Sequence, residues 1–380
     1  MTGVWWEYAA VFIASLLVSF VLTPLMVRLA LRQGFLDHPT DKKSHKSPIP
    51  YLGGLAMVTA FSIAVLAAAL LRPPDAGSDE LAAMVCMAVL LSLVGLADDL
   101  RGLGPVPRVV VEVAAGAAVW AVGAGVELTG TDIGDLAITV LWVVGITNAF
   151  NLLDNMDGLS AGVAAIAAGS CFVIAVVNGQ FLVGGLSAAL AGCALGFLRH
   201  NFHPARIYMG DAGSLYLGFL LAYLALKLRF DAPKDITFLV PILVLGVPIL
   251  DTSLVTVSRL LHRRSPFQGG RDHLSHRLVH LGLPVRGAVG AIYVAAASLG
   301  VLGLVVSRVG HTSAYVLTGL VFAVGAVVGF ALGRVPVYDE PARPATGRRK
   351  SRGVTSRHAG DRPPGRAAPV ASGRKLSRGR

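Results

Sequence analysis

The sequence is poor in charged residues and in cysteine. Asp, Glu, Lys and Arg make up only 14% of its 380 residues, whereas a soluble domain carries about 25%. Together with a hydrophobic fraction of 54% and a mean hydropathy of +0.67, this scarcity excludes an ordinary soluble domain. The three cysteines, Cys86, Cys171 and Cys193, lie inside apolar segments without paired spacing. We therefore expect packing residues, and neither a disulfide framework nor a cysteine metal site.

What the sequence has instead is a succession of long apolar runs. Most approach the roughly 20 residues that a helix needs to cross about 30 Å of hydrocarbon. They predict an all-α, polytopic membrane protein with about 11 transmembrane helices (10–11). No small-residue cleavage site follows the first run, so it is expected to be a retained helix. The predicted spans are 8–31, 51–71, 81–97, 107–125, 135–148, 158–177, 181–198, 212–229, 236–258, 287–307 and 312–333.

The net charge of +11 is concentrated at one end of the chain. Residues 334–380 contain 13 Lys or Arg, 3 Asp or Glu and almost no large apolar side chain. Such a segment buries too little surface to fold, so we expect a basic, disordered tail after a membrane domain of residues 1–333. Anionic lipid headgroups would attract this tail, and no nucleic-acid partner is expected.

The charged residues divide the predicted loops into two sets. Lys and Arg gather in the loops after the first, third, seventh and ninth spans, and the intervening loops hold few apart from Lys227, Arg229 and Lys234. Since an excess of Lys and Arg marks the cytoplasmic side, the odd-numbered loops and the C-terminus are predicted to be cytoplasmic, with the N-terminus outside.

The residue types capable of chemistry fall in the predicted cytoplasmic loops. A transporter or flippase of anionic lipid-linked substrates would instead need ionisable groups at mid-membrane depth that lead to both sides. Glu112 is the main such residue, and we expect it to be a buried or snorkelling acid. A one-sided site is therefore favoured over transport, and over a non-catalytic scaffold that recruits partners through its tail.

The first acidic motif is the pair Asp98-Asp99 at the end of a predicted span. Adjacent carboxylates repel each other unless a cation lies between them. Mg²⁺ takes one or two protein carboxylates and completes its shell with phosphate oxygens and water. The alternative is that the pair simply ends the span.

The second motif is Asn148-Ala-Phe-Asn151-Leu-Leu-Asp154-Asn-Met-Asp157-Gly158. Its polar residues recur at every third position, and residues three apart are neighbours on a helix. Asp154 and Asp157 could then share a metal or a substrate, with the asparagines as hydrogen-bonding groups. Capping and turn formation would explain one or two of these residues, not four.

Two further motifs complete the set. In Arg206-Ile-Tyr208-Met-Gly210-Asp211-Ala-Gly213-Ser214, Asp211 is either a helix N-cap or part of a metal site in an anion-binding pocket. In Gly269-Gly270-Arg271-Asp272-His273-Leu-Ser275-His276-Arg277, a glycine hinge precedes imidazole and guanidinium groups suited to a diphosphate. This loop could alternatively bind headgroups; a zinc site is disfavoured because a single pair of histidines has no cysteine beside it.

These motifs, in this order, resemble those of the polyprenyl-phosphate N-acetylhexosamine-1-phosphate transferase superfamily (the MraY/WecA family). The resemblance implies a bacterial plasma-membrane enzyme that transfers a sugar phosphate from a UDP-N-acetylhexosamine to a polyprenyl phosphate and releases UMP. A homodimer is a further expectation. The matching motifs are Leu52-Gly53-Gly54, Asp98-Asp99, Asn148 to Leu159, Met209-Gly210-Asp211-Ala-Gly213-Ser214 and Asp272-His273-Leu-Ser275-His276.

The resemblance also implies roles for individual residues. Asp211 resembles the ligand of Mg²⁺ (or Mn²⁺), with Asp154 beside the metal and sometimes proposed as a nucleophile. Asp98 and Asp99 resemble the paired acids near the metal and the lipid phosphate, and Asp98 is the favoured base. The residues expected at the nucleotide sugar are Asn148, Asn151, Asp157, Asn201, Tyr208, Arg271, His273 and His276. A basic residue before Leu52 is also expected, for which Lys43, His45 and Lys46 compete.

Two departures from the family pattern favour one branch. Family members commonly have three clustered histidines where this chain has His273-Leu-Ser275-His276, and Asn155 stands where glycine is usual in the MraY branch. We therefore expect a WecA-like enzyme that uses UDP-N-acetylglucosamine in the initiating step of cell-envelope glycan assembly. The phospho-MurNAc-pentapeptide transferase of peptidoglycan synthesis is the alternative.

Overall fold

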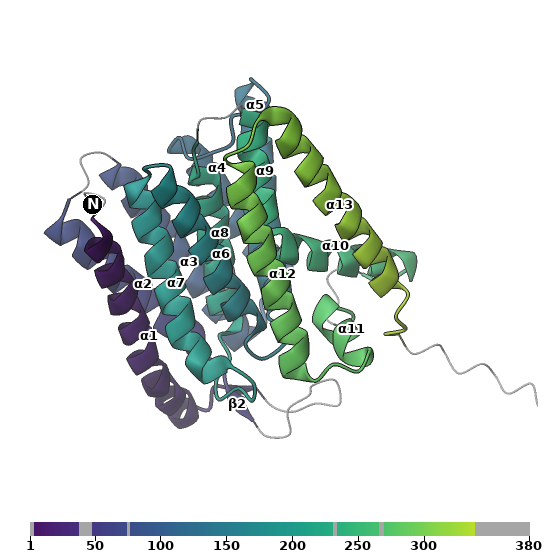
Figure 1. Cartoon of the computed structure of the whole chain (residues 1–380). Coiled ribbons are helices and arrows are strands. Elements are labelled where there is room, and N and C mark those ends of the chain that lie inside the picture. The colour runs from purple at the N-terminus through teal and green to yellow at the C-terminus, as the bar shows by residue number, and fades with distance from the viewer. Residues whose placement is uncertain (1–3, 38–47, 74–76, 231–233, 266–269, 339–380) are drawn as a thin grey trace, which may run out of the picture. The chain divides into compact units, whose positions relative to one another are not determined.

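The computed structural model describes residues 4–37, 48–73, 77–230, 234–265 and 270–338 (Figure 1). These residues form thirteen helices and one two-stranded antiparallel sheet, in which Leu36 pairs with Pro50 and Asp37 with Ile49. The elements are α1 (Trp5–Gln33), β1 (Leu36–Asp37), β2 (Ile49–Pro50), α2 (Gly53–Leu71), α3 (Ser78–Arg101), α4 (Pro105–Ala121), α5 (Asp132–Leu153), α6 (Leu159–Val177), α7 (Phe181–Asn201), α8 (Gly210–Lys227), α9 (Lys234–Val244), α10 (Gly246–Leu261), α11 (Leu274–His280), α12 (Val285–Val306) and α13 (His311–Gly333).

The architecture confirms an all-α polytopic membrane protein. Within the described residues, 8 helices are long and apolar enough to cross a membrane, or up to 9 if a bent pair counts as one span. The shortest predicted spans, 81–97 and 135–148, belong to α3 and α5, which have 24 and 22 residues. Their polar ends, with Asp98, Asp99 and Asn151, are thus part of the helices. The total of about 11 spans stays a prediction.

The predicted span at 236–258 is broken in the structure. The chain there forms two helices, Ile236–Val244 and Gly246–Leu261, which are bent by 74° at the break. Pro241 lies inside α9 and Pro248 in the first turn of α10. Proline supplies no amide hydrogen and clashes with the preceding turn, so apolar composition continues through this segment while the helix does not.

Helix α8 lies at the centre of the bundle and is in contact with α2, α3, α5, α6, α7 and α9. Every residue from Ala212 to Leu226 is buried. The indole nitrogen of Trp142 on α5 donates to the carbonyl oxygen of Ala222 at 3.1 Å. By contrast, α13 buries only Ala314, Thr318 and Leu332. An apolar helix exposed in this way suits a lipid environment. Helix α8, by contrast, lies inside the bundle, and its first turn lies there with it.

The alternating helix directions bring the polar segments to one end of the bundle. The amide nitrogen of Tyr208, before α8, donates to the carbonyl oxygen of Pro50 at 2.8 Å, and that of Gly53, at the start of α2, donates to Tyr208 at 3.0 Å. Figure 1 shows β2 and α11 at this lower end, with the described start of α1 at the other. This agrees with the predicted one-sided arrangement. The assignment of that side to the cytoplasm stays a prediction.

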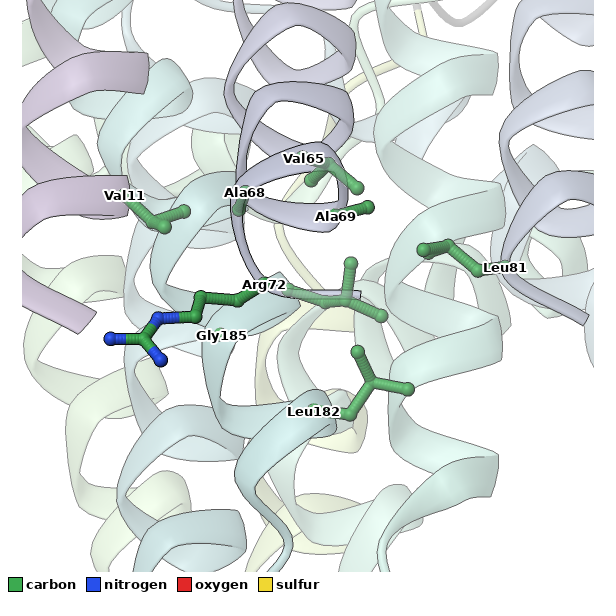
Figure 2. Close-up of a pocket in the computed structure, with 9 residues that line it drawn as sticks. Val11, Val65, Ala68, Ala69, Arg72, Leu81, Leu182 and Gly185 are labelled. Carbon is green, nitrogen blue, oxygen red and sulfur yellow. The ribbon is translucent and has the colours of Figure 1, made fainter. Parts of the chain in front are cut away.

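A small apolar pocket lies at the opposite end of the bundle (Figure 2). It is lined by the last turns of α2 and the starts of α3 and α7, through residues such as Val65, Leu81 and Leu182. Arg72 is its one charged lining residue. The pocket is therefore separate from the carboxylate-bearing ends of these helices.

The folded unit extends through Tyr338 rather than ending at residue 333. The Tyr338 hydroxyl donates to Asp272 at 2.6 Å, and the carbonyl oxygen of Val335 accepts from Arg277 at 3.1 Å. The start of the predicted tail is corrected accordingly. The rest of that tail, and Lys43, His45, Lys46 and Gly269, lie outside the described residues.

Candidate active site

Asp99 holds the first turn of α8 from a neighbouring helix. The first amide groups of a helix lack partners within it, and the carboxylate of Asp99 accepts from the amide nitrogens of Asp211 at 3.0 Å and Ala212 at 3.2 Å. Gly210 has φ +68°, and a Cβ there would lie 2.4 Å from the Asp99 carboxylate. Only glycine fits. Met209 is the N-cap residue, so the alternative that Asp211 is the N-cap is wrong.

The Asp211 side chain is thereby released for contacts across the end of the bundle. One carboxylate oxygen accepts from Asn151 Nδ2 at 2.8 Å and the other contacts the guanidinium of Arg108. The Asn151 amide also lies 2.9 Å from Ser214 Oγ. Arg108 reaches in turn to Asp98, 3.0 Å away. The structure therefore joins Asp98, Asn151 and Asp211, from α3, α5 and α8, as one polar cluster.

Asp154 follows the last residue of α5 and lies among other carboxylates. Burial, and then the negative charges of Asp211, Asp99 and Asp157 in that order, together raise its pKa to about 8. Carboxylates so close together repel each other, which disfavours the ionised form of each. A bound cation would relieve this repulsion. This arrangement brings Asp99, Asp154 and Asp211 together, as predicted.

The helical spacing predicted through Asp157 does not hold. Helix α5 ends at Leu153, and Asp154 to Gly158 form a turn. Asp157 accepts from His203 Nδ1 at 2.8 Å and from the Ala205 amide at 3.0 Å, which gives it a part in holding the segment after α7. The turn ends at Gly158, which takes a left-handed conformation with φ +77° and is the N-cap of α6.

Asn148 and Asn201 were predicted to contact a nucleotide, and in the structure both form hydrogen bonds with other residues of the protein. Asn148 donates to the buried carboxylate of Glu112 and to the Val144 carbonyl, so Glu112 is a buried acid rather than a snorkelling one. Asn201, 2% exposed, accepts from the Gly158 amide and donates to the Ile207 carbonyl. Both asparagines hold protein groups in place, and their direct contact with a nucleotide stays a prediction.

Tyr208 lies beside the turn of Asp154 to Gly158, called the acidic turn below. It is partly buried, and burial together with the charges of Asp157, Asp37 and Asp154 raises the pKa of its phenol well above the usual range. The phenol therefore stays neutral in the physiological range. The expected contact of Tyr208 with the nucleotide sugar stays a prediction.

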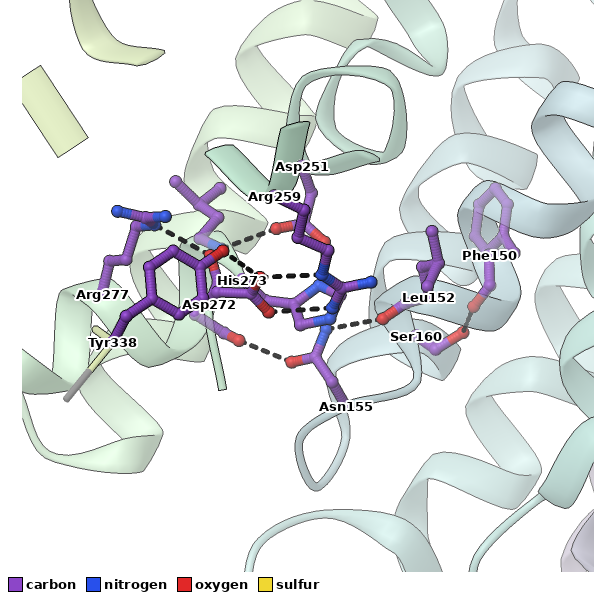
Figure 3. Close-up of polar contacts among 12 residues, drawn as sticks. Phe150, Leu152, Asn155, Ser160, Asp251, Arg259, Asp272, His273, Arg277 and Tyr338 are labelled. Carbon is purple, nitrogen blue, oxygen red and sulfur yellow. Dashed lines mark hydrogen bonds and ion pairs between the residues drawn. The ribbon is translucent and has the colours of Figure 1, made fainter. Parts of the chain in front are cut away.

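The basic loop before α11 is held by buried acids (Figure 3). His273 Nδ1 lies 2.8 Å from Asp251 Oδ2, and Asp251 also accepts from the Leu274 amide at 2.6 Å. Asp272 forms two bonds of 2.8 Å with Arg259. Although burial raises the pKa of Asp272, hydrogen bonds from Arg259 and Tyr338 and the nearby positive charges lower it to about 2.

Asp251, like Arg108, is a site residue that the sequence motifs do not identify. It is the one carboxylate within the apolar run 236–258, and this was the available signal, because a charged side chain there needs a partner. The structure supplies that partner in His273, which is 3% exposed. The carboxylate fixes the ring orientation of His273.

The two arginines of the basic segment Gly270 to Arg277 differ in exposure. Arg277 is fully buried, and its guanidinium donates to Ser258 Oγ and to the carbonyl oxygens of Asp272 and Leu332. It is therefore a structural residue, and its predicted grouping with the diphosphate-binding residues is wrong. Arg271 is exposed and free to serve as predicted. The rings of His273 and His276 have centroids 6.4 Å apart.

The carboxylate cluster fits a hard divalent cation. Among the residues that the structure describes, no three His, Cys, Asp or Glu side chains form a group that could hold a metal by themselves. Mg²⁺ needs only one or two carboxylates beside phosphate oxygens and water. Asp211 with Asp154 nearby meets that requirement. After burial, the charge of Asp211 is the next cause that raises the pKa of Asp154, and a cation would balance that charge.

Comparison with known proteins agrees with these motifs. The chain matches glycosyl transferase family 4 over residues 81–229. It is 34% identical over 293 residues to a protein of Bacillus subtilis named "Probable undecaprenyl-phosphate N-acetylglucosaminyl 1-phosphate transferase", covering 74% of this chain and 80% of that protein. It is 32% identical to a decaprenyl-phosphate N-acetylglucosaminephosphotransferase of Mycolicibacterium smegmatis, with 76% and 79% covered.

A third relative represents the peptidoglycan branch. The chain is 30% identical to a phospho-N-acetylmuramoyl-pentapeptide-transferase of Bacillus pumilus, covering 58% of this chain and 74% of that protein. The Bacillus subtilis and Mycolicibacterium smegmatis proteins are therefore more similar in identity, and over more of this chain, than the Bacillus pumilus protein. Since four-fifths of the Bacillus subtilis protein is covered at this identity, the chain belongs to glycosyl transferase family 4, the polyprenyl-phosphate N-acetylhexosamine-1-phosphate transferase superfamily.

Proposed function

We propose that this enzyme transfers N-acetylglucosamine-1-phosphate from UDP-N-acetylglucosamine to a polyprenyl phosphate, giving polyprenyl-diphosphate-N-acetylglucosamine and UMP. This would be the initiating step of cell-envelope glycan assembly. The observation that carries the proposal is the cluster of Asp98, Asp99, Asn151 and Asp211 around the first turn of α8. The names of the more similar relatives supply the sugar and the lipid class.

The cluster offers a base and a cation-binding pair at one place. Asp211 and Asp154 would hold Mg²⁺ (or Mn²⁺), which when bound neutralises charge on a diphosphate. Asp98 is 11% exposed and accepts from the Gly104 amide at 3.1 Å as well as from Arg108. It is thus oriented to take the last proton of the lipid phosphate.

The reaction then follows as a direct displacement. An oxygen of the lipid phosphate attacks the phosphorus that carries the sugar, a new diphosphate bond forms, and the old P–O bond breaks so that UMP leaves. Arg271, at the exposed edge of the basic loop, would neutralise charge as the bond breaks. The rival is a two-step path through a phospho-aspartate at Asp154. Trapping a UMP-releasing phospho-enzyme without lipid would establish that rival.

The proposal is tested with purified protein, polyprenyl phosphate, Mg²⁺ and a panel of UDP-sugars, with UMP release as the readout. UDP-N-acetylglucosamine should be the preferred donor, and Asp211→Asn and Asp154→Asn should abolish release. Asp132→Asn, which removes an exposed carboxylate in the first turn of α5, is the matched control and should keep full activity. Preference for UDP-MurNAc-pentapeptide would assign the chain to the peptidoglycan branch instead.

The cytoplasmic position of the site is part of the same proposal. Its support is the excess of Lys and Arg in the loops at that end of the bundle, since such an excess marks the cytoplasmic side. A cysteine introduced at Arg101, which is exposed at the end of α3, should react with an impermeant thiol reagent in inverted vesicles only. Reaction in right-side-out vesicles alone would reverse the orientation.

A further inference from the structure

Arg108 bridges two carboxylates of the candidate site. Helix α4 begins after Gly104 with Pro105, and its first turns place Arg108 against the ends of α3 and α8. The same terminal nitrogen lies 3.0 Å from Asp98 Oδ2 and also contacts Asp211 Oδ2. Arg108 is 18% exposed, Asp98 11% and Asp211 27%, so this ion pair is largely shielded from solvent.

Both carboxylate oxygens of Asp211 contact protein groups, and Arg108 holds Oδ2. Oδ1 of Asp211 accepts from Asn151. Both carboxylate oxygens of Asp99 accept from the amide groups of α8. A divalent cation coordinated by Asp211 would lie about 2.0–2.1 Å from the carboxylate oxygen. At Oδ2 it would meet the guanidinium, and two positive charges this close repel strongly in a poorly hydrated site.

The guanidinium is also incompletely bonded where it lies. Arg108 Nε is buried and has no hydrogen-bond partner within the described residues. An arginine selected only to tie α3, α4 and α8 together would be expected to use its donors fully. Arg108 instead concentrates one nitrogen on the two carboxylates, as a counter-ion does.

We propose that Arg108 is a built-in counter-ion that competes with the divalent cation for Asp211. Arg108 balances the negative charges of Asp98 and Asp211 until the cation binds. The cation then displaces the guanidinium from Asp211 Oδ2. Arg108 is thus a positioning residue that sets the cation affinity of the site. The inference rests on the proposed function, because it requires that Asp211 bind a cation.

The test is a Mn²⁺ titration of the purified full-length protein without substrate, followed by the loss of the free-ion signal in electron paramagnetic resonance. Arg108→Met keeps most of the side-chain length and removes the charge, so Mn²⁺ should bind about tenfold more tightly than in the wild type. Arg101→Met removes an exposed arginine at the end of α3 and should leave the affinity unchanged. Asp211→Asn should abolish binding at this site.

A second readout separates competition from a purely structural ion pair. In EDTA, Arg108→Met should have a lower Tm than the wild type because Asp98 and Asp211 lose their counter-charge, and Mg²⁺ should raise its Tm by more than that of the wild type. Equal or weaker Mn²⁺ binding in Arg108→Met would overturn the competition. Absence of any binding that depends on Asp211 in the wild type would instead overturn the metal site itself.

Discussion

Ser275 Oγ donates a hydrogen bond of 2.6 Å to Oδ1 of Asn155 (Figure 3). This contact joins the start of α11 to the turn after α5. The two residues stand at the positions where the sequence departs from the family pattern, so both departures belong to one interaction. The Asn155 amide is itself fixed by the Leu152 carbonyl at 2.7 Å. The basic loop is therefore docked on the acidic turn by a defined bond.

Loss of this bond should weaken the binding of the donor. In Ser275→Ala one hydrogen bond of about 0.5–1.5 kcal/mol disappears, and we expect the KM for the UDP-sugar to rise roughly threefold to tenfold with a smaller change in kcat. Ser170→Ala removes a hydroxyl that bonds only within its own helix, to Ile166, and should behave as wild type. Wild-type kinetics in Ser275→Ala would show that the docking bond is irrelevant to turnover.

His276 should make the protein less stable in mild acid. Burial and the positive charges of His273 and Arg271 lower its pKa to about 4, against the opposing effect of Asp251 and Asp272. The unfolded chain takes up this proton near pH 6.5. Between pH 6.5 and 4 the unfolded state thus binds more protons, and the free energy of unfolding falls as the pH falls.

The measurement compares the decline of Tm from pH 7 to pH 4.5 in the wild type and in His276→Gln. The variant should lose less stability, by about 1–3 kcal/mol. His280→Gln changes an exposed histidine on the same helix and serves as the control. Identical declines in wild type and His276→Gln would contradict the assigned shift.

The crossing of α2 and α8 should tolerate no added methyl group. A Cβ on Gly54 would lie 2.3 Å from the backbone nitrogen of Gly213, and the overlap is with backbone rather than with a flexible side chain. Gly54→Ala should therefore cost about 1–3 kcal/mol or more and displace the first turn of α8. We expect a lower Tm and at least a tenfold loss of UMP release.

Gly145→Ala is the matched control for this substitution. A Cβ on Gly145 in α5 has nothing within 4 Å, so the added methyl should leave stability and turnover close to wild type or raise stability slightly. An active, stable Gly54→Ala protein would mean that the helices at the site separate easily.

Truncations should place the functional end of the chain at Tyr338. Removal of 339–380 should leave UMP release nearly intact. Removal of 334–380 also deletes the Tyr338 hydroxyl bonded to Asp272 and the Val335 carbonyl bonded to Arg277, and should cost about 1–3 kcal/mol of stability. Tm and UMP release of both variants test this. Loss of turnover in the shorter deletion would support a scaffold role for the tail.

Composition and motif order determine much of this protein. Scarce charge and repeated apolar runs predict the all-α membrane class, because water-free surroundings accept few other residues. Loop composition predicts that the polar segments share one side. The acidic motifs predict that Asp99, Asp154 and Asp211 lie together, since repelling carboxylates need a common cation.

Only the tertiary structure decides which groups these residues contact. Three contacts depend on how helices distant in the sequence pack against one another. Asp99 accepts hydrogen bonds from the amides of α8, Arg108 lies between Asp98 and Asp211, and Asp251 orients His273. Hydrophobic periodicity is a local property. A hydrogen bond or ion pair depends on distances of about 3 Å between side chains, which are set by the packing of whole helices.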